Sequence, residues 1–142
     1  MTDLGPPAAG APPTALVVDD EPTLRLVLRR ALARDGWGVE EAADGLAALE
    51  RLRDAGERYG VVFLDLAMPG LSGRQLYERL RDERPALVER LVIVSGASEP
   101  WVAAAGCAQL PKPFDLTEVR ALARDVAGRA GCEFPPVVMP TS

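Results

Sequence analysis

The stretch VVFLDLAMPGLSG, residues 61–73, decides the fold class of this chain of 142 residues. Its first part, residues 61–64, is an apolar run with no polar alternation. Such a run is typical of a central strand in a parallel sheet, because helices cover both faces of that sheet. Residues 65–72 predict a loop, and residues 73–83 predict a helix that ends before Pro85.

Strand and helix patterns alternate on both sides of this stretch. Short apolar runs predict strands, and apolar residues three and four positions apart predict helices. The predicted strands are residues 15–18, 39–42, 61–64, 91–94 and 108–110. The predicted helices are residues 22–34, 45–55 and 73–83, and a last helix between the capping box of Asp115 and Glu118 and a stop at Gly128. The inward faces predicted for the first two helices include Val27 and Leu46.

This alternation predicts an α/β fold, a doubly wound five-stranded parallel sheet. Prolines concentrate near both ends of the chain, which predicts an N-terminal tail at residues 1–14 and a C-terminal tail at residues 129–142. One domain, residues 15–128, lies between them. A content of 48% hydrophobic and 26% charged residues is typical of a soluble globular domain.

The composition excludes several kinds of chemistry. The chain has no histidine, so it lacks Ser-His-Asp and Cys-His nucleophiles and imidazole metal ligands. Cys107 and Cys132 have no companion cysteine, which indicates neither a zinc site nor a disulfide framework. A net charge of −5 disfavours a nucleic-acid surface. No apolar run could span a bilayer and no segment directs export, so we expect a cytoplasmic location and no membrane partner.

In a doubly wound sheet the ligand site lies beyond the carboxyl ends of the strands. The residues that follow the predicted strands place three carboxylates, a hydroxyl and an ammonium group at one edge of the sheet. Each of these groups, taken alone, is common at a strand end. The residues are Asp19 and Asp20 after the first strand, Asp65 after the third, Ser95 after the fourth and Lys112 after the fifth.

A cation and a covalent acceptor follow from this set. Carboxylates repel one another by about 1 kcal/mol per pair at 4 Å even in bulk water, so the site requires positive charge. Hard oxygen ligands suit Mg²⁺, and Lys112 supplies a second positive charge. Aspartate is a known covalent acceptor of phosphoryl groups, and the chain has no histidine to compete with it. Asp65, on the central strand, is the candidate nucleophile.

Four motifs in order resemble the receiver domain of two-component response regulators. They are VVDDEP (residues 17–22), VVFLDLAMPGLSG (61–73), VIVSG (92–96) and LPKPFD (110–115). The resemblance implies a flavodoxin-like receiver fold and a phosphoacceptor that switches conformation. The phosphoryl group would come from a phosphohistidine on a sensor histidine kinase or a histidine phosphotransfer protein, and the switched domain would act on an unknown downstream protein target.

The resemblance also implies a role for each site residue. Asp65 would accept the phosphoryl group. Asp20, Asp65 and the backbone carbonyl of Ala67 would bind Mg²⁺ directly, and Asp19 would bind it through water.

Two further residues would act on the phosphate itself. Lys112 would pair with the phosphate, and Ser95 would donate its hydroxyl to a phosphate oxygen. Movement of Ser95 toward the added charge is the expected switch. The Lys112–Pro113 peptide bond would be cis, an allowed geometry because it precedes proline.

The chain departs from the family pattern between Ser95 and Lys112. Receivers usually carry an aromatic residue three positions before the lysine, where this chain has Gln109. Trp101 is a possible substitute, but a tryptophan in a short connection is more often simple packing. Thirteen residues, 95–107, connect the fourth and fifth strands, so we expect the fourth helix to be short or absent.

These features set the expected interaction surfaces. Many receivers dimerise through the face formed by the fourth helix, the fifth strand and the fifth helix. A short or missing fourth helix makes dimerisation through this face less favourable, so we expect a monomer or weak dimer. The helix at residues 22–34 is predicted to carry arginines on its outer side, as a solvated face or as a kinase-docking surface nearby. They are Arg25, Arg29, Arg30 and Arg34.

Two other functions stay open from the residues. The first is a phosphorylation-independent protein-interaction module, a pseudo-receiver, against which the intact carboxylates, Ser95 and Lys112 argue. The second is a Mg²⁺-dependent phosphatase, which usually needs a second acid where this chain has Ala67. We therefore expect no enzyme, but a phosphoacceptor that assists its own phosphorylation and dephosphorylation.

Overall fold

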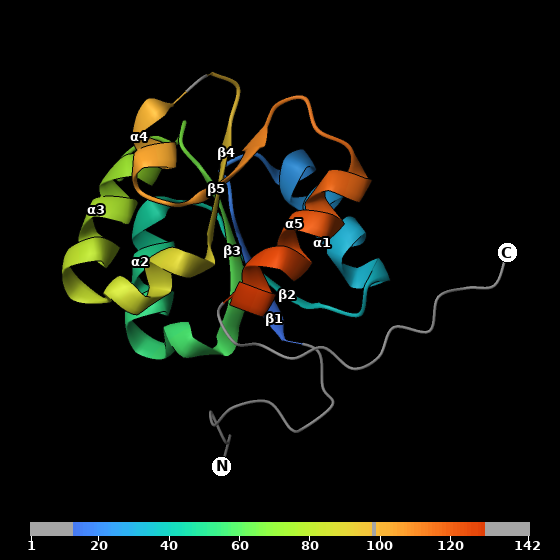
Figure 1. Ribbon diagram of the computed structural model, residues 1–142, viewed down its shortest axis with the longest axis horizontal. Coiled ribbons are helices and arrows are strands. Elements are labelled where there is room, and N and C mark those ends of the chain that lie inside the picture. Colours follow the sequence, from blue (N-terminus) through green and yellow to red (C-terminus); the bar gives the residue numbers. More distant parts are fainter. Residues whose placement is uncertain (1–12, 98, 130–142) are drawn as a thin grey trace, which may run out of the picture.

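The computed structural model describes residues 13–97 and 99–129, and Figure 1 shows a single sheet between two layers of helices. The parallel strands follow the order β2-β1-β3-β4-β5. They are β1 (Thr14–Val18), β2 (Gly38–Ala42), β3 (Tyr59–Asp65), β4 (Leu91–Ser95) and β5 (Ala108–Pro111). The predicted doubly wound sheet is confirmed. The parts of residues 1–14 and 129–142 that lie outside the described ranges, and Cys132 with them, receive no structural description.

The helices divide between the two faces of the sheet (Figure 1). One layer holds α1 (Pro22–Arg34) and α5 (Leu116–Arg129), and the other holds α2 (Gly45–Ala55), α3 (Gly73–Glu83) and α4 (Pro100–Ala104). Short 3-10 helices, η1 (Gly56–Arg58) and η2 (Pro85–Arg90), lead into β3 and β4. No helix in the described part of the chain is long and apolar enough to cross a bilayer.

Strand β3 explains the apolar run that predicts it, because all of its residues are buried. Val62 and Leu64 face the core under α2 and α3, whereas Val61 and Phe63 face the core under α1 and α5. The alternation of side chains across a strand therefore sends apolar residues into two separate cores. Asp65, at the end of the strand, is its only charged residue.

The inward faces predicted for α1 and α2 are partly wrong. Leu46 is 57% exposed and Val27 is 37% exposed. In α2 the buried face runs through Gly45, Ala48, Leu49 and Leu52, and Leu46 is turned about 100° from Gly45 by the helical repeat. Val27 precedes the buried Leu28 by one position and is turned away from the core for the same reason.

The fourth helix is short, as predicted from the length of the connection. It contains five residues, and the chain leaves it through Gly106, whose φ of 78° favours glycine. The Trp101 ring lies 5.0 Å from the Tyr77 ring of α3, and the Arg74 guanidinium lies 5.4 Å from the Trp101 ring centre. Helix α4 is thus held against α3 by contacts among these three side chains.

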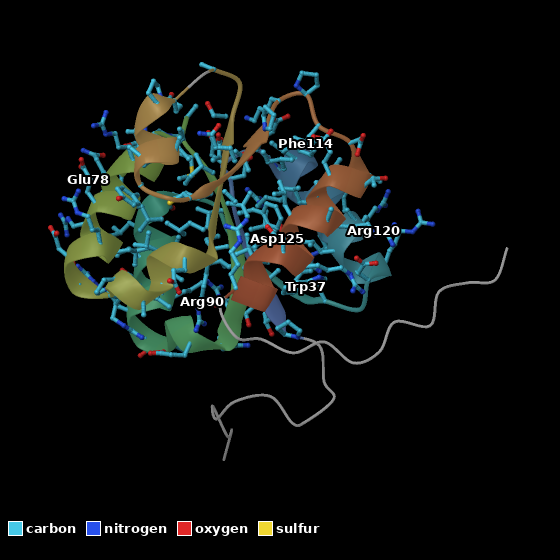
Figure 2. The ribbon with its side chains drawn as sticks, viewed as in Figure 1. Trp37, Glu78, Arg90, Phe114, Arg120 and Asp125 are labelled. Carbon is cyan, nitrogen blue, oxygen red and sulfur yellow. The ribbon has the colours of Figure 1, made fainter. Side chains whose placement is uncertain are left out.

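An ion pair ties the other two helices together on the opposite face. Arg120 of α5, labelled in Figure 2, donates to the buried carboxylate of Asp35 just beyond α1, with nitrogen and oxygen 2.7 Å apart. This hydrogen bond holds the pKa of Asp35 below its usual value. The contact fixes α5 against the end of α1.

One close approach positions β3 and α3 relative to each other. A Cβ atom on Gly73 would lie 2.5 Å from the carbonyl oxygen of Asp65 and 2.8 Å from Cα of Leu66. Only glycine permits helix α3 to begin this close to the end of β3. A capping box between Ser72 and Gln75 then starts the helix. The backbone beside Asp65 is therefore held by α3 as well as by the sheet.

Candidate functional site

Three carboxylates meet beyond the carboxyl ends of β1 and β3. Oxygen atoms of Asp19, Asp20 and Asp65 all lie within 4.8 Å of one another. The register that pairs Val18 with Leu64 brings the residues that follow these strands side by side. Asp19 is 2% exposed and Asp65 is 4% exposed, whereas Asp20 lies open to solvent. The predicted cluster is present, with one open side.

The pKa of Asp19 is shifted by this arrangement of carboxylates. Burial raises the pKa of its carboxyl above the usual value, and the negative charges of Asp65 and Asp20 add to that rise. The backbone N–H of Glu21, which donates to Asp19 Oδ1 at 2.8 Å, and the charge of Lys112 act in the opposite direction. A cation placed among these oxygens would relieve both the repulsion and the burial cost.

Lys112 brings a positive charge to Asp65. Its Nζ lies 3.5 Å from Asp65 Oδ1, and its backbone N–H donates to the carbonyl of Ser95 at 2.9 Å. It is the only lysine in a chain whose other cationic side chains are arginines. An ammonium group is a compact point charge, whereas a guanidinium is a wide planar fork. The Lys112–Pro113 peptide bond is cis, as expected.

Ser95 ends β4 with its hydroxyl turned to its own loop. Its Oγ accepts from the Ala97 N–H at 3.1 Å and donates to the Ala97 carbonyl at 3.0 Å. A cavity of about 20 Å³ beside it is lined by Ser95, Val102 and Gln109, among others. To donate to another group, this hydroxyl must give up its bond to the Ala97 carbonyl.

Gln109 and Trp101 have separate surroundings. The Gln109 amide donates to the Glu99 carbonyl at 3.4 Å, across the cavity that lies beside Ser95. Trp101 packs on α3 and is not among the residues that line this cavity. The interpretation of Trp101 as simple packing is therefore favoured over its use as a replacement aromatic.

Ala67 lies in the exposed loop between β3 and α3. Its backbone N–H donates to Asp65 Oδ1 at 3.2 Å, which fixes the loop to the Asp65 carboxylate. Its methyl side chain leaves this side of the cluster uncovered. The loop therefore supplies backbone groups beside Asp65 and no further acid.

Arg25 corrects a prediction from the sequence. We expected it on the outer side of α1 with the other arginines, yet its side chain is 16% exposed. Its Nη1 donates to the carbonyl of Asp19 at 2.6 Å, and its Nε donates to Glu41 Oε1 of β2 at 3.0 Å. Two adjacent glutamates on β2, Glu40 and Glu41, are the signal in the sequence that could have indicated such a partner.

The donor set fits the hard divalent cation predicted for it. Asp19, Asp20 and Asp65 offer carboxylate oxygens within one coordination sphere's reach, and none of their neighbours named above is a soft ligand. Oxygen ligands of this kind, with one side open to solvent, are typical of Mg²⁺ sites in phosphoryl-transfer proteins. Lys112 completes the balance of charge at the buried end of the cluster.

Comparisons of sequence relate the chain to known regulators. The family model for the response regulator receiver domain matches residues 15–124. The probable transcriptional regulatory protein TcrX of Mycobacterium tuberculosis is 38% identical over 127 residues, which cover 87% of this chain and 53% of TcrX. The sensor kinase CckA of Brucella abortus is 34% identical over 118 residues, 80% of this chain and 12% of that kinase. The chain spans about half the length of the transcriptional regulators it matches.

Comparisons of structure give the same result. The chemotaxis protein CheY4 of Vibrio cholerae superposes with a TM-score of 0.69 at 26% identity, covering 82% of this chain and 99% of CheY4. The receiver domain of the Francisella response regulator 1452 superposes with a TM-score of 0.74 at 24% identity, covering 82% of this chain and 98% of that domain. The predicted flavodoxin-like receiver fold is confirmed.

Proposed function

This chain belongs to the receiver-domain family of response regulators, whose members are phosphoacceptor signalling domains, and we propose that Asp65 is its phosphoacceptor. The observation that carries the proposal is the placement of Asp65. It is buried at the end of the central strand, within reach of two other carboxylates and 3.5 Å from the ammonium of Lys112.

The proposed reaction moves one phosphoryl group from nitrogen to oxygen. A carboxylate oxygen of Asp65 attacks phosphorus of the phosphohistidine, the P–O bond forms as the P–N bond breaks, and the electron pair stays with the imidazole that leaves. Since residues 1–142 contain no histidine, we propose that the donor is a sensor histidine kinase or a histidine phosphotransfer protein. The chain is then the acceptor in the reaction and not an enzyme acting on a separate substrate.

The residues around Asp65 would place positive charge beside the incoming phosphoryl group. Asp20, Asp65 and the Ala67 carbonyl would bind Mg²⁺ directly and Asp19 through water, and Mg²⁺ when bound neutralises charge on the transferring group. Lys112 would pair with a phosphate oxygen, because its ammonium already lies beside Asp65. Positioning and charge neutralisation are the main requirements of such a transfer.

Ser95 would couple phosphorylation of Asp65 to a change at the surface of the domain. Phosphorylation adds roughly −1.5 to −2 charge at neutral pH, which attracts a hydroxyl donor. The Ser95 hydroxyl would exchange its bond to the Ala97 carbonyl for a phosphate oxygen, and the loop that leads to α4 would follow. Because α4 has five residues, the moving surface is small, and we propose that the chain acts as a monomer or weak dimer in the cytoplasm.

The proposed acceptor activity is tested with a small phosphodonor. Incubation with Mg²⁺ and acetyl phosphate should add one phosphoryl group, detected by intact mass, and chelation of Mg²⁺ should prevent the addition. No gain of mass in the presence of Mg²⁺ would contradict the proposal and favour a pseudo-receiver. Steady release of phosphate from a generic phosphomonoester would instead indicate a phosphatase.

The proposed switch is tested through Trp101. In a Trp37→Phe background, which leaves Trp101 as the only tryptophan, Mg²⁺ with beryllofluoride should change the fluorescence. The change is expected because Trp101, which contacts Tyr77, lies in α4, and Ser95 is hydrogen-bonded to Ala97 in the loop that leads to this helix. Adding Ser95→Ala should reduce it severalfold, since the phosphate mimic then lacks the hydroxyl that draws the loop. An equal change in both proteins would exclude Ser95 as the moving group.

A further inference from the structure

The turn between β1 and α1 must hold two carboxylates against a third. Asp19 and Asp20 lie in this turn, and their oxygens lie within 4.8 Å of those of Asp65. At such separations like charges repel, so an unrestrained turn would relax away from β3. Some contact must therefore hold the turn in place before any cation arrives.

Asp19 is held at three points. Its backbone N–H donates to the Ala42 carbonyl of β2 at 3.1 Å, and its Oδ1 accepts from the N–H of Glu21 at 2.8 Å. Its carbonyl accepts from Arg25 Nη1 at 2.6 Å. Ala42 and Glu21 make these contacts through their backbones, so Arg25 is the one partner of the three that acts through its side chain.

Arg25 is itself anchored to the sheet. Its Nε lies 3.0 Å from Glu41 Oε1, and the other oxygen of Glu41 lies 2.7 Å from Nε of Arg29. Glu41 belongs to β2 and pairs in register with Val17 of β1, two residues before Asp19. The link from β2 through Glu41 and Arg25 to the Asp19 carbonyl thus fastens the acidic turn to the edge of the sheet.

We propose that Arg25 is a positioning residue for the metal site, which holds the Asp19–Asp20 turn in the geometry that binds Mg²⁺. The inference rests on the proposed function, because it concerns the cation that phosphorylation of Asp65 requires. In this role Arg25 would contact neither the cation nor the phosphate. It acts through the backbone of Asp19, as supporting groups around metal ligands do.

The direction in which Mg²⁺ affinity changes after loss of Arg25 distinguishes a positioning role from a purely electrostatic one. Removing a positive side chain from the neighbourhood of three carboxylates would, by electrostatics alone, strengthen the binding of Mg²⁺. Loss of a positioning contact would weaken it, because the turn relaxes under the mutual repulsion. Weaker binding after loss of a nearby cation is therefore the signature of the proposed role.

Arg29 provides a matched control within the same helix. It lies one turn after Arg25 and pairs with the same Glu41. Arg29 also donates to the Val39 carbonyl at 3.3 Å, whereas the Asp19 carbonyl accepts from Arg25. Arg25→Gln and Arg29→Gln each remove one positive charge from α1, so a difference between them reports on the contact to the acidic turn.

The experiment compares Mg²⁺ binding, by calorimetry at fixed ionic strength, in the unaltered chain and in both variants. Arg25→Gln should weaken Mg²⁺ binding by about tenfold, the lower end for supporting groups of metal ligands. Arg29→Gln should leave it unchanged or slightly stronger. With acetyl phosphate, Arg25→Gln should need a higher Mg²⁺ concentration for half-maximal phosphorylation. At saturating Mg²⁺ it should reach the same maximal rate as the unaltered chain.

Unchanged or stronger Mg²⁺ binding in Arg25→Gln overturns the proposal. If that variant unfolds, Arg25→Lys keeps the charge but cannot reach both Asp19 and Glu41, and it should bind Mg²⁺ severalfold more weakly. Normal binding by Arg25→Lys would likewise overturn the proposal. Failure of the unaltered chain to be phosphorylated would instead contradict the proposed function, so the two failures are distinguishable.

Discussion

Asp65→Asn is expected to abolish phosphorylation by acetyl phosphate and Mg²⁺. The amide oxygen is a poor nucleophile, and the substitution removes one of the three carboxylates that would hold the cation. The expected result is no gain of mass after an incubation in which the unaltered chain gains one phosphoryl group.

The fold of this variant should survive, which makes the result interpretable. Asp65 is buried beside two carboxylates, so an uncharged side chain of nearly the same shape relieves repulsion as it loses the contact to Lys112. We expect a melting temperature no lower than that of the unaltered chain. Asp82→Asn, at an exposed position of α3, is the matched control and should gain the phosphoryl group normally. A phosphoryl group on Asp65→Asn would mean that another residue is the acceptor.

Lys112→Met is expected to slow phosphorylation by about two orders of magnitude, the usual cost of removing one charge-stabilising donor from a transition state. The ammonium lies 3.5 Å from Asp65 Oδ1 and is the positive side chain at that end of the carboxylate cluster. Methionine keeps much of the length and the apolar part of the side chain. The rate is measured by intact mass against time at saturating Mg²⁺.

The same variant should bind Mg²⁺ more tightly. The positive charge of Lys112 acts to lower the pKa of Asp19, so it offsets the negative charge of the carboxylates. Without this charge the carboxylates should attract Mg²⁺ more strongly. A slower reaction with tighter metal binding distinguishes loss of this charge from general disruption, which would weaken both. Arg81→Met, at an exposed position of α3, is the control for loss of one positive charge. An unchanged rate in Lys112→Met would remove the lysine from the proposed reaction.

Most of the site was predictable because its residues follow strand ends. In a parallel sheet all carboxyl ends lie at one edge, so Asp19, Asp65 and Ser95 come together as soon as the strands are identified. The strands were identifiable from their apolar runs, since β3 is buried on both faces. The short α4 was predictable from chain length alone.

The remaining features depend on side-chain reach and on small rotations. The helical repeat placed Arg25 on the outer side of α1, but its long side chain crosses from the helix to β2 and to the Asp19 carbonyl. Leu46 lies only one position from a buried residue of α2, and that single step carries it into solvent. The packing of Trp101 on α3 depends on Tyr77 and Arg74, which are distant in sequence.

Identification of the modified residue is the most direct test of the central claim that Asp65 accepts the phosphoryl group. After reaction with acetyl phosphate and Mg²⁺, borohydride reduces an aspartyl phosphate to homoserine, which marks the acceptor in peptide sequencing by mass spectrometry. We predict homoserine at position 65 and aspartate retained at positions 19 and 20. Homoserine at either of those positions, or a phosphoryl group on a hydroxyl residue with position 65 unaltered, would contradict it.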